Sequence, residues 1–160
     1  MAEITLCNVT RENWKEVCLL NSGNDWTYVA PNSFSLVQEY YTEGLTSKAI
    51  LADGKIVGYT LYGWHEKDGG YELWRFMIDK SCQGKGYGKK ALIAIIDAMF
   101  EQYNCSEILL HLTEGNDRGA HIYEKIGFVA TDKKETEDVN GEKHVERIYA
   151  LKRENYTPEK

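Results

Sequence analysis

The stretch DKSCQGKGYGKK, residues 79–90, places three glycines among lysines directly before an apolar run, ALIAIIDAMF. Glycine lets a backbone approach a ligand closely, and the N-terminal end of a helix presents N–H groups with partial positive charge. Lys85, Lys89 and Lys90 add full positive charges. The loop therefore predicts a site for an anion such as a pyrophosphate or a ribose phosphate, and the alternative is a solvated lysine turn.

The spacing of the glycines distinguishes between classes of phosphate site. A P-loop, G-x-x-x-x-G-K-[ST], ending after Gly88 would require a glycine where the chain has Gln83 and a hydroxyl where it has Lys90. A dinucleotide-binding loop, G-x-G-x-x-G, is excluded because the glycines at 84, 86 and 88 are evenly spaced. The pattern that remains is Q-x-x-G-x-G between an expected strand and an expected helix.

Two motifs resemble those of one enzyme family. Gln83-x-x-Gly86-x-Gly88 is similar to the acetyl-CoA pyrophosphate loop of the GNAT family of N-acetyltransferases. About thirty residues later, NDRGAHIYEKIGF resembles the family's second motif, N-x-x-[AG]-x-x-x-Y-x-x-x-G-F, which is matched by Asn116, Gly119, Tyr123, Gly127 and Phe128. Three further stretches, VAPNSFSLVQEYY, RFMID and QGKGYGKKAL, resemble the family's bacterial diamine and spermine/spermidine N-acetyltransferases.

The resemblance implies a reaction and a set of coenzyme contacts. We expect direct transfer of an acetyl group from acetyl-CoA to a primary amine of a small polyamine, in a ternary complex and without an acyl-enzyme. Backbone N–H groups of the strand at 75–78, around Met77, would polarise the thioester carbonyl as an oxyanion hole does. The expected coenzyme-binding residues are Phe76, Met77, Ile78, Gln83, Gly84, Lys85, Gly86, Tyr87, Gly88, Lys89, Asn116, Gly119 and Tyr123.

Tyr123 is the expected general acid. It follows Asn116 by seven residues, about two helical turns along the same face. A phenol with a pKa of about 10 can protonate a thiolate whose conjugate acid has a pKa of about 8.5. The alternative is a packed aromatic ring whose hydroxyl only hydrogen-bonds the coenzyme. Asn116 is expected to cap its helix, to contact the pantetheine arm, or to do both.

The general base is where the chain departs from the polyamine-acetylating members, which often carry a carboxylate at the strand position held here by Trp74. Glu72 lies two residues earlier on the same strand face and is the expected substitute, acting through a water. Its alternative is a solvent-exposed strand carboxylate. A primary amine with a pKa of about 10 is already neutral in roughly one molecule per thousand at pH 7, so a strong base is not required.

An acidic and aromatic segment is expected to bind the acceptor amine. Carboxylates and aromatic rings suit a polyammonium ligand through charge pairing and cation–π contacts. The candidate residues are Asp25, Trp26, Tyr28, Glu39, Tyr40 and Tyr41, together with Trp74 on the strand. For at least half of them the alternative is ordinary packing of an amphipathic helix. Trp64 and His65 end a strand near the same mouth.

No metal site is expected from the sequence. The cysteines at positions 7, 18, 82 and 105 contain no C-x-x-C pair, and Cys82, beside the glycine loop, has no partnered base that would make it a nucleophile. His111 and His121 lack metal-ligand partners at recognisable spacing. Both histidines are therefore expected to serve structural roles.

These residues need a scaffold of strands and helices to bring them together. Strands are expected at 3–9, on both sides of Asp53-Gly54, at 71–79, at 106–113 and on both sides of Asn140-Gly141. Helices are expected after Thr10, after Ser33, after the glycine loop of residues 79–90 as far as about Tyr103, and at 116–127. The order βααβββαβαββ predicts an α/β fold. The resemblance implies a mixed, mostly antiparallel seven-stranded sheet with a splayed central strand pair, flanked by about four helices.

Length and charge set the remaining expectations. The 160 residues fit a single domain over 1–160, with a frayed tail at 155–160. The net charge of −6 argues against nucleic acid and for a cationic ligand. No apolar run reaches the roughly 18 residues of a membrane span, and the polar start is unlike a signal peptide, so we expect a cytoplasmic protein without membrane contact. Dimerisation is common in the family, which leaves a homodimer open.

Two alternatives to polyamine acetylation stay open at this point. The transfer machinery is shared across acceptors, so an aminoglycoside, an amino acid or a protein amine would be handled by the same motifs. Outside the enzyme class, the alternative is a non-catalytic acyl-CoA-binding module. Tyr123 argues against such a module, whereas the departure at Trp74 leaves it open.

Overall fold

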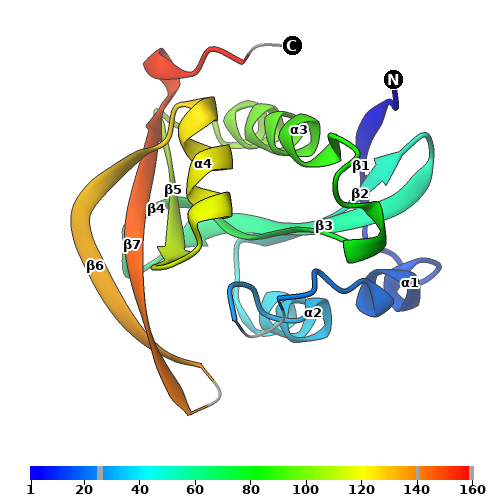
Figure 1. The fold of residues 1–160 in the computed structure, drawn as a ribbon, viewed down its shortest axis with the longest axis horizontal. Coiled ribbons are helices and arrows are strands. Elements are labelled where there is room, and N and C mark those ends of the chain that lie inside the picture. The colour runs from blue at the N-terminus through cyan, green and yellow to red at the C-terminus, as the bar shows by residue number, and fades with distance from the viewer. Residues whose placement is uncertain (25–26, 140, 159–160) are drawn as a thin grey trace.

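The protein is built on one seven-stranded sheet with helices on both faces (Figure 1). A computed structural model describes residues 1–24, 27–139 and 141–158. Across the sheet the strands follow the order β1-β2-β3-β4-β5-β7-β6. Every neighbouring pair is antiparallel except β4 and β5, which run parallel. The expected mixed, mostly antiparallel sheet is therefore confirmed.

The elements follow the expected order. The strands are β1 (Ile4–Asn8), β2 (Leu45–Ala52), β3 (Lys55–His65), β4 (Gly70–Ile78), β5 (Glu107–Thr113), β6 (Val129–Val139) and β7 (Glu142–Lys152). The helices are α1 (Trp14–Leu19), α2 (Asn32–Tyr41), α3 (Tyr87–Tyr103) and α4 (Asp117–Ile126), with short 3-10 turns at Lys80–Cys82 and Arg153–Asn155.

Each face of the sheet has its own core. Helices α3 and α4 cover one face, and α1 and α2 cover the other (Figure 1). Helix α3 buries the stripe expected from its spacing, namely Leu92, Ile95, Ile96 and Met99. On the opposite face, Val17 of α1 shares a core with Tyr59 and Leu61 of β3. Among the described residues, no helix combines the length and the apolar composition that crossing a bilayer requires.

Helix α1 starts later than the sequence predicts. It begins at Trp14 rather than directly after Thr10, because the intervening residues form turns. Thr10 Oγ1 accepts a hydrogen bond from the N–H of Glu12 at 3.3 Å, and Asn13 Oδ1 accepts one from the N–H of Thr10 at 2.7 Å. Such side-chain bonds compete with the helical pattern.

Strand β4 carries one more residue than the part of β3 that it pairs with. The register joins Leu61 to Arg75 and Tyr62 to Leu73, so Trp74 is a bulge. Leu73 then belongs to the core under α3, whereas Trp74 packs on the side of α1 and α2. The bulge therefore shifts the alternation of side chains along β4 by one position.

Strands β4 and β5 form the splayed central pair that the resemblance implies. Their ladder contains one paired position, Glu72 opposite Leu109, near the start of both strands. Beyond this pair, β4 and β5 line opposite walls of one cavity. The parallel pair therefore opens the sheet at the place where the glycine loop and α4 begin.

Candidate active site

A groove of about 1000 Å³ lies between β4 and β5 and reaches both faces of the sheet. Its two ends differ in composition. The loop end is formed by the glycine loop and α4, with Gln83, Gly84, Gly86, Tyr87, Gly88, Lys89, Asn116, Gly119 and Tyr123. The hairpin end is formed by β3, β4, β5 and the β6–β7 hairpin, with His65, Lys67, Glu72, His111, Glu135, Glu137, Asp138, His144 and Glu146.

The glycine loop presents its backbone to the groove. Gly84 and Gly86 have φ values of +78° and +79°, a left-handed conformation that favours glycine. Gly86 directly precedes the first residue of α3. A Cβ atom added at Gly84, Gly86 or Gly88 would meet no neighbouring heavy atom within 4 Å. The open space and the helix N-terminus together leave room for an anionic group at this end of the groove.

Gln83 holds the loop in place. Its Nε2 donates hydrogen bonds to the carbonyl of Ser22 at 2.8 Å and to the carbonyl of Ile78 at 2.9 Å. The amide of this expected coenzyme contact is thus engaged within the chain, although the residue lines the groove. Its side chain braces the loop against the end of β4.

The three lysines of the loop differ in their relation to the groove. Lys89 lines the groove, whereas Lys85 and Lys90 are not part of its lining. Lys90 Nζ instead donates to the carbonyl of Ala2 at 3.2 Å and so ties α3 to the start of the chain. Lys89 is therefore the lysine best placed to contact an anionic group in the loop end.

The peptide groups of β4 alternate between β3 and the groove. The N–H of Asp79 donates to the carbonyl of Val57 on the β3 side at 2.8 Å. In an antiparallel ladder this sets the peptide of Met77 against β3 and turns those of Phe76 and Ile78 toward the gap. An N–H of Phe76 or Ile78 is thus better placed than that of Met77 to polarise a carbonyl in the groove.

Helix α4 begins with the cap that the second motif predicts. Asn116 Oδ1 accepts a hydrogen bond from the N–H of Gly119 at 3.0 Å. A Cβ atom at position 119 would lie only 2.6 Å from Asn116 Nδ2, so a larger residue here would have to shift the capping side chain. Asn116 therefore caps the helix and lines the groove at the same time.

Tyr123 lies half-buried in the wall of the groove. Its ring packs edge-on against Phe128, with centroids 5.7 Å apart. Burial raises the pKa of the Tyr123 hydroxyl above its usual value, so the group keeps its proton at neutral pH. Its hydroxyl has no hydrogen-bond partner among the described residues. The proton is therefore available to a molecule in the groove.

Glu72 is buried, so the alternative of a solvent-exposed strand carboxylate is wrong. The residue is 3% exposed, and it faces the same side of the sheet as Trp74, as expected. Its Oε2 lies 3.4 Å from Nδ1 of His65, and its Oε1 lies 3.4 Å from Nε2 of His111. Glu72 is therefore part of a cluster of ionisable groups at the hairpin end.

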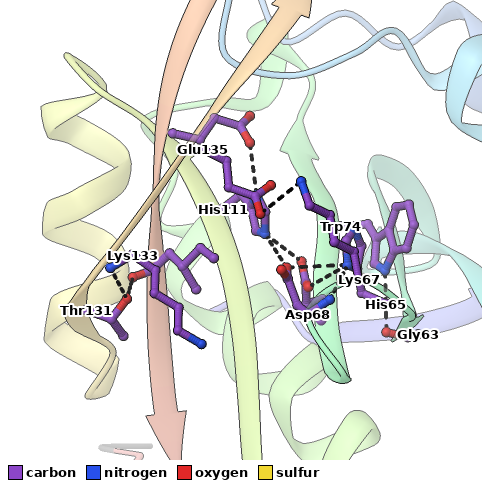
Figure 2. Close-up of polar contacts among 12 residues, drawn as sticks. Gly63, His65, Lys67, Asp68, Trp74, His111, Thr131, Lys133 and Glu135 are labelled. Atoms are coloured by element: carbon purple, nitrogen blue, oxygen red, sulfur yellow. Dashed lines mark hydrogen bonds and ion pairs between the residues drawn. The ribbon is translucent and has the colours of Figure 1, made fainter.

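His111 lies beside carboxylates that its sequence spacing does not show. Figure 2 shows His65, Asp68 and His111 directed toward one another. His111 Nε2 lies 2.5 Å from Asp68 Oδ2, and its Nδ1 lies 3.0 Å from Glu146 Oε2. These partners are 43 and 35 residues away in the chain, so their approach depends on the sheet rather than on local spacing.

The cluster shifts the pKa values of its members. Burial and the neighbouring carboxyl of Asp68 raise the pKa of Glu72 to about 9. Although burial opposes it, Glu146 and Asp68 raise the pKa of His111 to about 9. Burial opposes the shift of Asp68 too, yet hydrogen bonds with Glu72 and His111 lower its pKa. At neutral pH Glu72 thus holds a proton, beside a carboxylate and an imidazolium.

Two of the predicted acceptor-binding residues line the groove. The hydroxyl of Tyr28 donates to the carbonyl of Gly115 at 3.4 Å, which places it between α2 and α4. Trp74 lies against His65, with ring centroids 4.9 Å apart. Both are positioned to contact a molecule at the hairpin end.

The remaining predicted acceptor-binding residues lie elsewhere. Glu39 Oε1 accepts a hydrogen bond from a β2 backbone N–H at 3.1 Å and is not part of the groove lining. Tyr40 and Tyr41 are 81% and 79% exposed and pack edge-on against each other. Asp25 and Trp26 lie outside the described residues.

The carboxylates of the β6–β7 hairpin were missed by sequence reasoning. Glu135, Glu137, Asp138 and Glu146 all line the groove. The period-two spacing of Glu135 and Glu137 signals one face of a strand, but nothing local shows that this face bends over a groove. The long β6–β7 hairpin curves past β5 at the edge of the sheet (Figure 1).

Comparisons with known proteins point to one family. The family model described as the acetyltransferase (GNAT) family matches residues 14–128. A probable spermine N(1)-acetyltransferase of Bacillus subtilis subsp. natto (strain BEST195) is 32% identical over 147 residues, covering 88% of this chain and 95% of its own. A spermine/spermidine N(1)-acetyltransferase of Bacillus subtilis (strain 168) is 31% identical over 147 residues, which again cover 88% of this chain and 95% of the relative.

A solved structure shares the fold. The crystal structure of a spermidine N-acetyltransferase from Vibrio cholerae, in complex with CoA and spermine, superposes with a TM-score of 0.74. The alignment covers 96% of this chain and 97% of that one, at 18% sequence identity. At this identity the likeness concerns the fold, and it spans the whole sheet and its helices.

Proposed function

Because the chain belongs to the GNAT family and is an acetyltransferase, we propose that its acceptor is a primary amine of a small polyamine. The observation that carries the proposal is the continuity of the groove, which joins the glycine loop to a wall of carboxylates. A chain of ammonium groups is complementary to such a wall. The relatives named for spermine and spermidine support the same substrate class.

The proposed reaction uses the two ends of the groove together. The loop end holds the pyrophosphate of acetyl-CoA, and the pantetheine arm runs along β4 toward Glu72. The N–H groups of Phe76 and Ile78 lie where they can stabilise negative charge on the thioester oxygen. The amine nitrogen attacks the carbonyl carbon, the carbon–sulfur bond breaks, and the amide and CoA thiol leave the groove.

Tyr123 supplies the proton to the departing thiolate in this proposal. Its raised pKa makes the phenol a weaker acid, but a thiolate formed beside the same buried wall of the groove is also less solvated and correspondingly more basic. The unpartnered hydroxyl has no bond within the described chain to give up before it donates. A single proton transfer then completes the release of CoA.

Deprotonation of the acceptor requires no strong base. The neutral fraction of a primary amine, roughly one in a thousand at pH 7, is the nucleophile, and the attack releases a second amine proton to water. Glu72, the base expected from its strand position, holds a proton in the free protein. In the proposal it lines the acceptor site rather than removing the proton.

The alternatives predict different behaviour of the same groove. An aminoglycoside, an amino acid or a protein amine would use the loop end in the same way and differ only at the hairpin end. A non-catalytic acyl-CoA-binding module would bind the coenzyme without releasing thiol. The groove bears carboxylates from both strands of the hairpin, which favours an acceptor with several positive charges.

An acceptor panel tests the proposal. Acetyl-CoA is mixed with spermine, spermidine, putrescine, an aminoglycoside or a lysine peptide, and release of free thiol is followed. We expect the polyamines to give the highest kcat/KM, with n-butylamine as the control that has the amine but lacks the second charge. Equal kcat/KM for butylamine and putrescine would refute the role of the carboxylate wall. Thiol release only with a non-polyamine acceptor would refute the substrate class.

A further inference from the structure

Four side chains at the hairpin end converge on one point from three strands and a turn. His65 ends β3, Asp68 belongs to the β3–β4 turn, Glu72 lies on β4 and His111 on β5. Figure 2 shows the converging histidines and Asp68. The ligand-type atoms of His65, Asp68 and Glu72 lie within 4.8 Å of one another. Three of the four residues belong to strands, and none of the four side chains is more than 21% exposed.

Three separations within the cluster are close to the edge length of a coordination tetrahedron. His65 Nδ1 lies 3.4 Å from Asp68 Oδ2 and 3.4 Å from Glu72 Oε2, and His111 Nε2 lies 3.4 Å from Glu72 Oε1. Zinc bonds of about 2.0–2.1 Å in tetrahedral geometry imply ligand–ligand distances of about 3.3–3.4 Å. Binding one ion through a single oxygen of Glu72 requires the contact between Asp68 and His111 to lengthen and His111 to move toward His65, since the ligand-type atoms of the two histidines do not fall in one group within 4.8 Å.

Glu72 points to a missing partner in the middle of the cluster. The residue is 3% exposed, and its Oε2 has no hydrogen-bond partner. A buried carboxyl oxygen without a partner is costly. Nδ1 of His65 faces it and accepts a hydrogen bond from the N–H of Asp68 at 3.2 Å, so this nitrogen carries a lone pair rather than a proton. A cation between these atoms would satisfy the Glu72 oxygen and would replace the N–H of Asp68 at the His65 nitrogen.

A carboxylate behind His111 completes the arrangement. Glu146 Oε2 lies 3.0 Å from Nδ1 of His111, on the side of the ring away from the cluster. Metal-binding histidines commonly pair their second nitrogen with a carboxylate in this way, which fixes the ring and directs the other nitrogen at the ion. Here the nitrogen so directed is Nε2, which faces Asp68 and Glu72.

From these contacts we propose that His65, Asp68, Glu72 and His111 form a binding site for a divalent transition-metal ion, with Zn²⁺ the best fit. Two imidazole nitrogens with two carboxylate oxygens suit zinc, whereas magnesium and calcium prefer oxygen ligands throughout. The ion is held by His65 Nδ1, His111 Nε2, Asp68 Oδ2 and one oxygen of Glu72, and Glu146 orients His111.

The position of the site has a consequence for the acceptor. The same residues line the hairpin end of the groove, so a bound ion places two positive charges where an ammonium group would lie. The ion and a polyamine should therefore exclude each other. This consequence rests on the proposed function, whereas binding of the ion does not.

The test measures metal binding without any turnover. The chelator-treated chain is titrated with Zn²⁺ by calorimetry, and bound zinc is counted by elemental analysis after dialysis. We expect one ion per chain, and a 10–100-fold weaker affinity in Glu72→Gln and in His65→Asn. His144→Asn is the matched control, because His144 lines the same groove but lies outside the cluster. Its zinc affinity should stay within about twofold of the parent chain's.

Cobalt substitution provides the second readout and identifies the ligands. Co²⁺ in the site should give the strong visible absorption of a tetrahedral ion, without the near-ultraviolet thiolate band that a cysteine ligand would add. Circular dichroism confirms that each variant is folded. Failure of the parent chain to bind zinc, or equal zinc affinity in the folded Glu72→Gln and His65→Asn variants, would overturn the proposal.

Discussion

The loop end of the groove is formed mainly by backbone groups, whereas the hairpin end is formed mainly by ionisable side chains. The loop end uses peptide groups and small residues that follow one another along the chain, between Gln83 and Lys89 and at the start of α4. The hairpin end uses ionisable side chains brought together from β3, β4, β5, β6 and β7. One end is therefore a shaped backbone, and the other is an assembled set of charges.

This difference determines how each end responds to substitution. A peptide N–H cannot be removed by changing its own side chain, but a new side chain can block access to it. A carboxylate is removed by a single isosteric change. Added atoms should therefore impair the loop end, lost charges should impair the hairpin end, and Tyr123 between them should affect both substrates equally.

The largest effect is expected for Tyr123→Phe. Loss of the phenol removes the proton donor to the thiolate, and general acids of this kind contribute about 10²–10⁴ in rate. We expect kcat to fall at least about 100-fold, with the Kd of acetyl-CoA within about twofold of the parent value. Steady-state kinetics and calorimetry with CoA separate the two quantities.

Tyr28→Phe is the control for this substitution. Tyr28 also lines the groove, but its hydroxyl makes only a 3.4 Å contact with a carbonyl, so kcat should change less than about threefold. Turnover of Tyr123→Phe equal to that of Tyr28→Phe would contradict the assignment of the proton donor.

The double change Glu137→Gln with Asp138→Asn tests the charges of the hairpin end. Both residues line the groove near its rim. We expect the KM for spermidine to rise about tenfold and its dependence on salt to weaken, while the KM for acetyl-CoA stays constant. Glu12→Gln with Glu16→Gln changes the net charge equally at exposed positions near α1. If the KM for spermidine rose equally in the Glu12→Gln, Glu16→Gln variant, the effect would come from net charge alone.

Gly88→Ala should move stability and binding in opposite directions. Gly88 lies in the first turn of α3, its φ is not positive, and an added Cβ meets no atom within 4 Å. Alanine should therefore stabilise the fold by about 0.5 kcal/mol. The same methyl group enters the space assigned to the pyrophosphate, so we expect a roughly fivefold higher KM for acetyl-CoA. An unchanged KM alongside a raised Tm would place the coenzyme elsewhere.

The smallest effect distinguishes two adjacent lysines. Lys89 lines the groove, and Lys90 donates to the carbonyl of Ala2. We expect Lys89→Ala to raise the KM for acetyl-CoA about two- to threefold at low salt, because an exposed charge contributes little. Lys90→Ala should leave this KM unchanged. Measurements at two ionic strengths check that the Lys89 effect is electrostatic, and equal KM values for the two variants would count against the distinction.

The loop end was predictable because its function depends on neighbours in sequence. Gln83, Gly86 and Gly88 act within one turn, and Asn116, Gly119 and Tyr123 act within two turns of one helix. Residues that act together at such short spacings can be recognised as a motif in the sequence. The element order followed from local signals of the same kind, such as the Asp53-Gly54 pair, whose two positive φ angles form the turn of the β2–β3 hairpin.

The hairpin end was not predictable in the same way. His111 meets Asp68 and Glu146 only after β5 has been placed between β4 and β7, and the isolated sequence positions carry no common period. The predicted acceptor residues failed for a related reason. Glu39 bonds β2 and Tyr40 faces outward, because the acidic and aromatic composition of α2 does not tell which of its faces meets the groove.

The bulged residue Trp74 interrupts the alternation of side chains along β4. Before the bulge, the side chain of Glu72 faces the hairpin end. After it, the peptide groups of Phe76 and Ile78 face the gap between β4 and β5. Deleting position 74 would restore a continuous alternation. Glu72 and Leu73 would keep their present faces, because Leu73 already lies under α3 opposite Tyr62 and Arg75 already reaches Gln38 of α2 on the other side of the sheet. The bulge therefore adds one aromatic side chain to the groove side of β4 and leaves both halves of the strand in place.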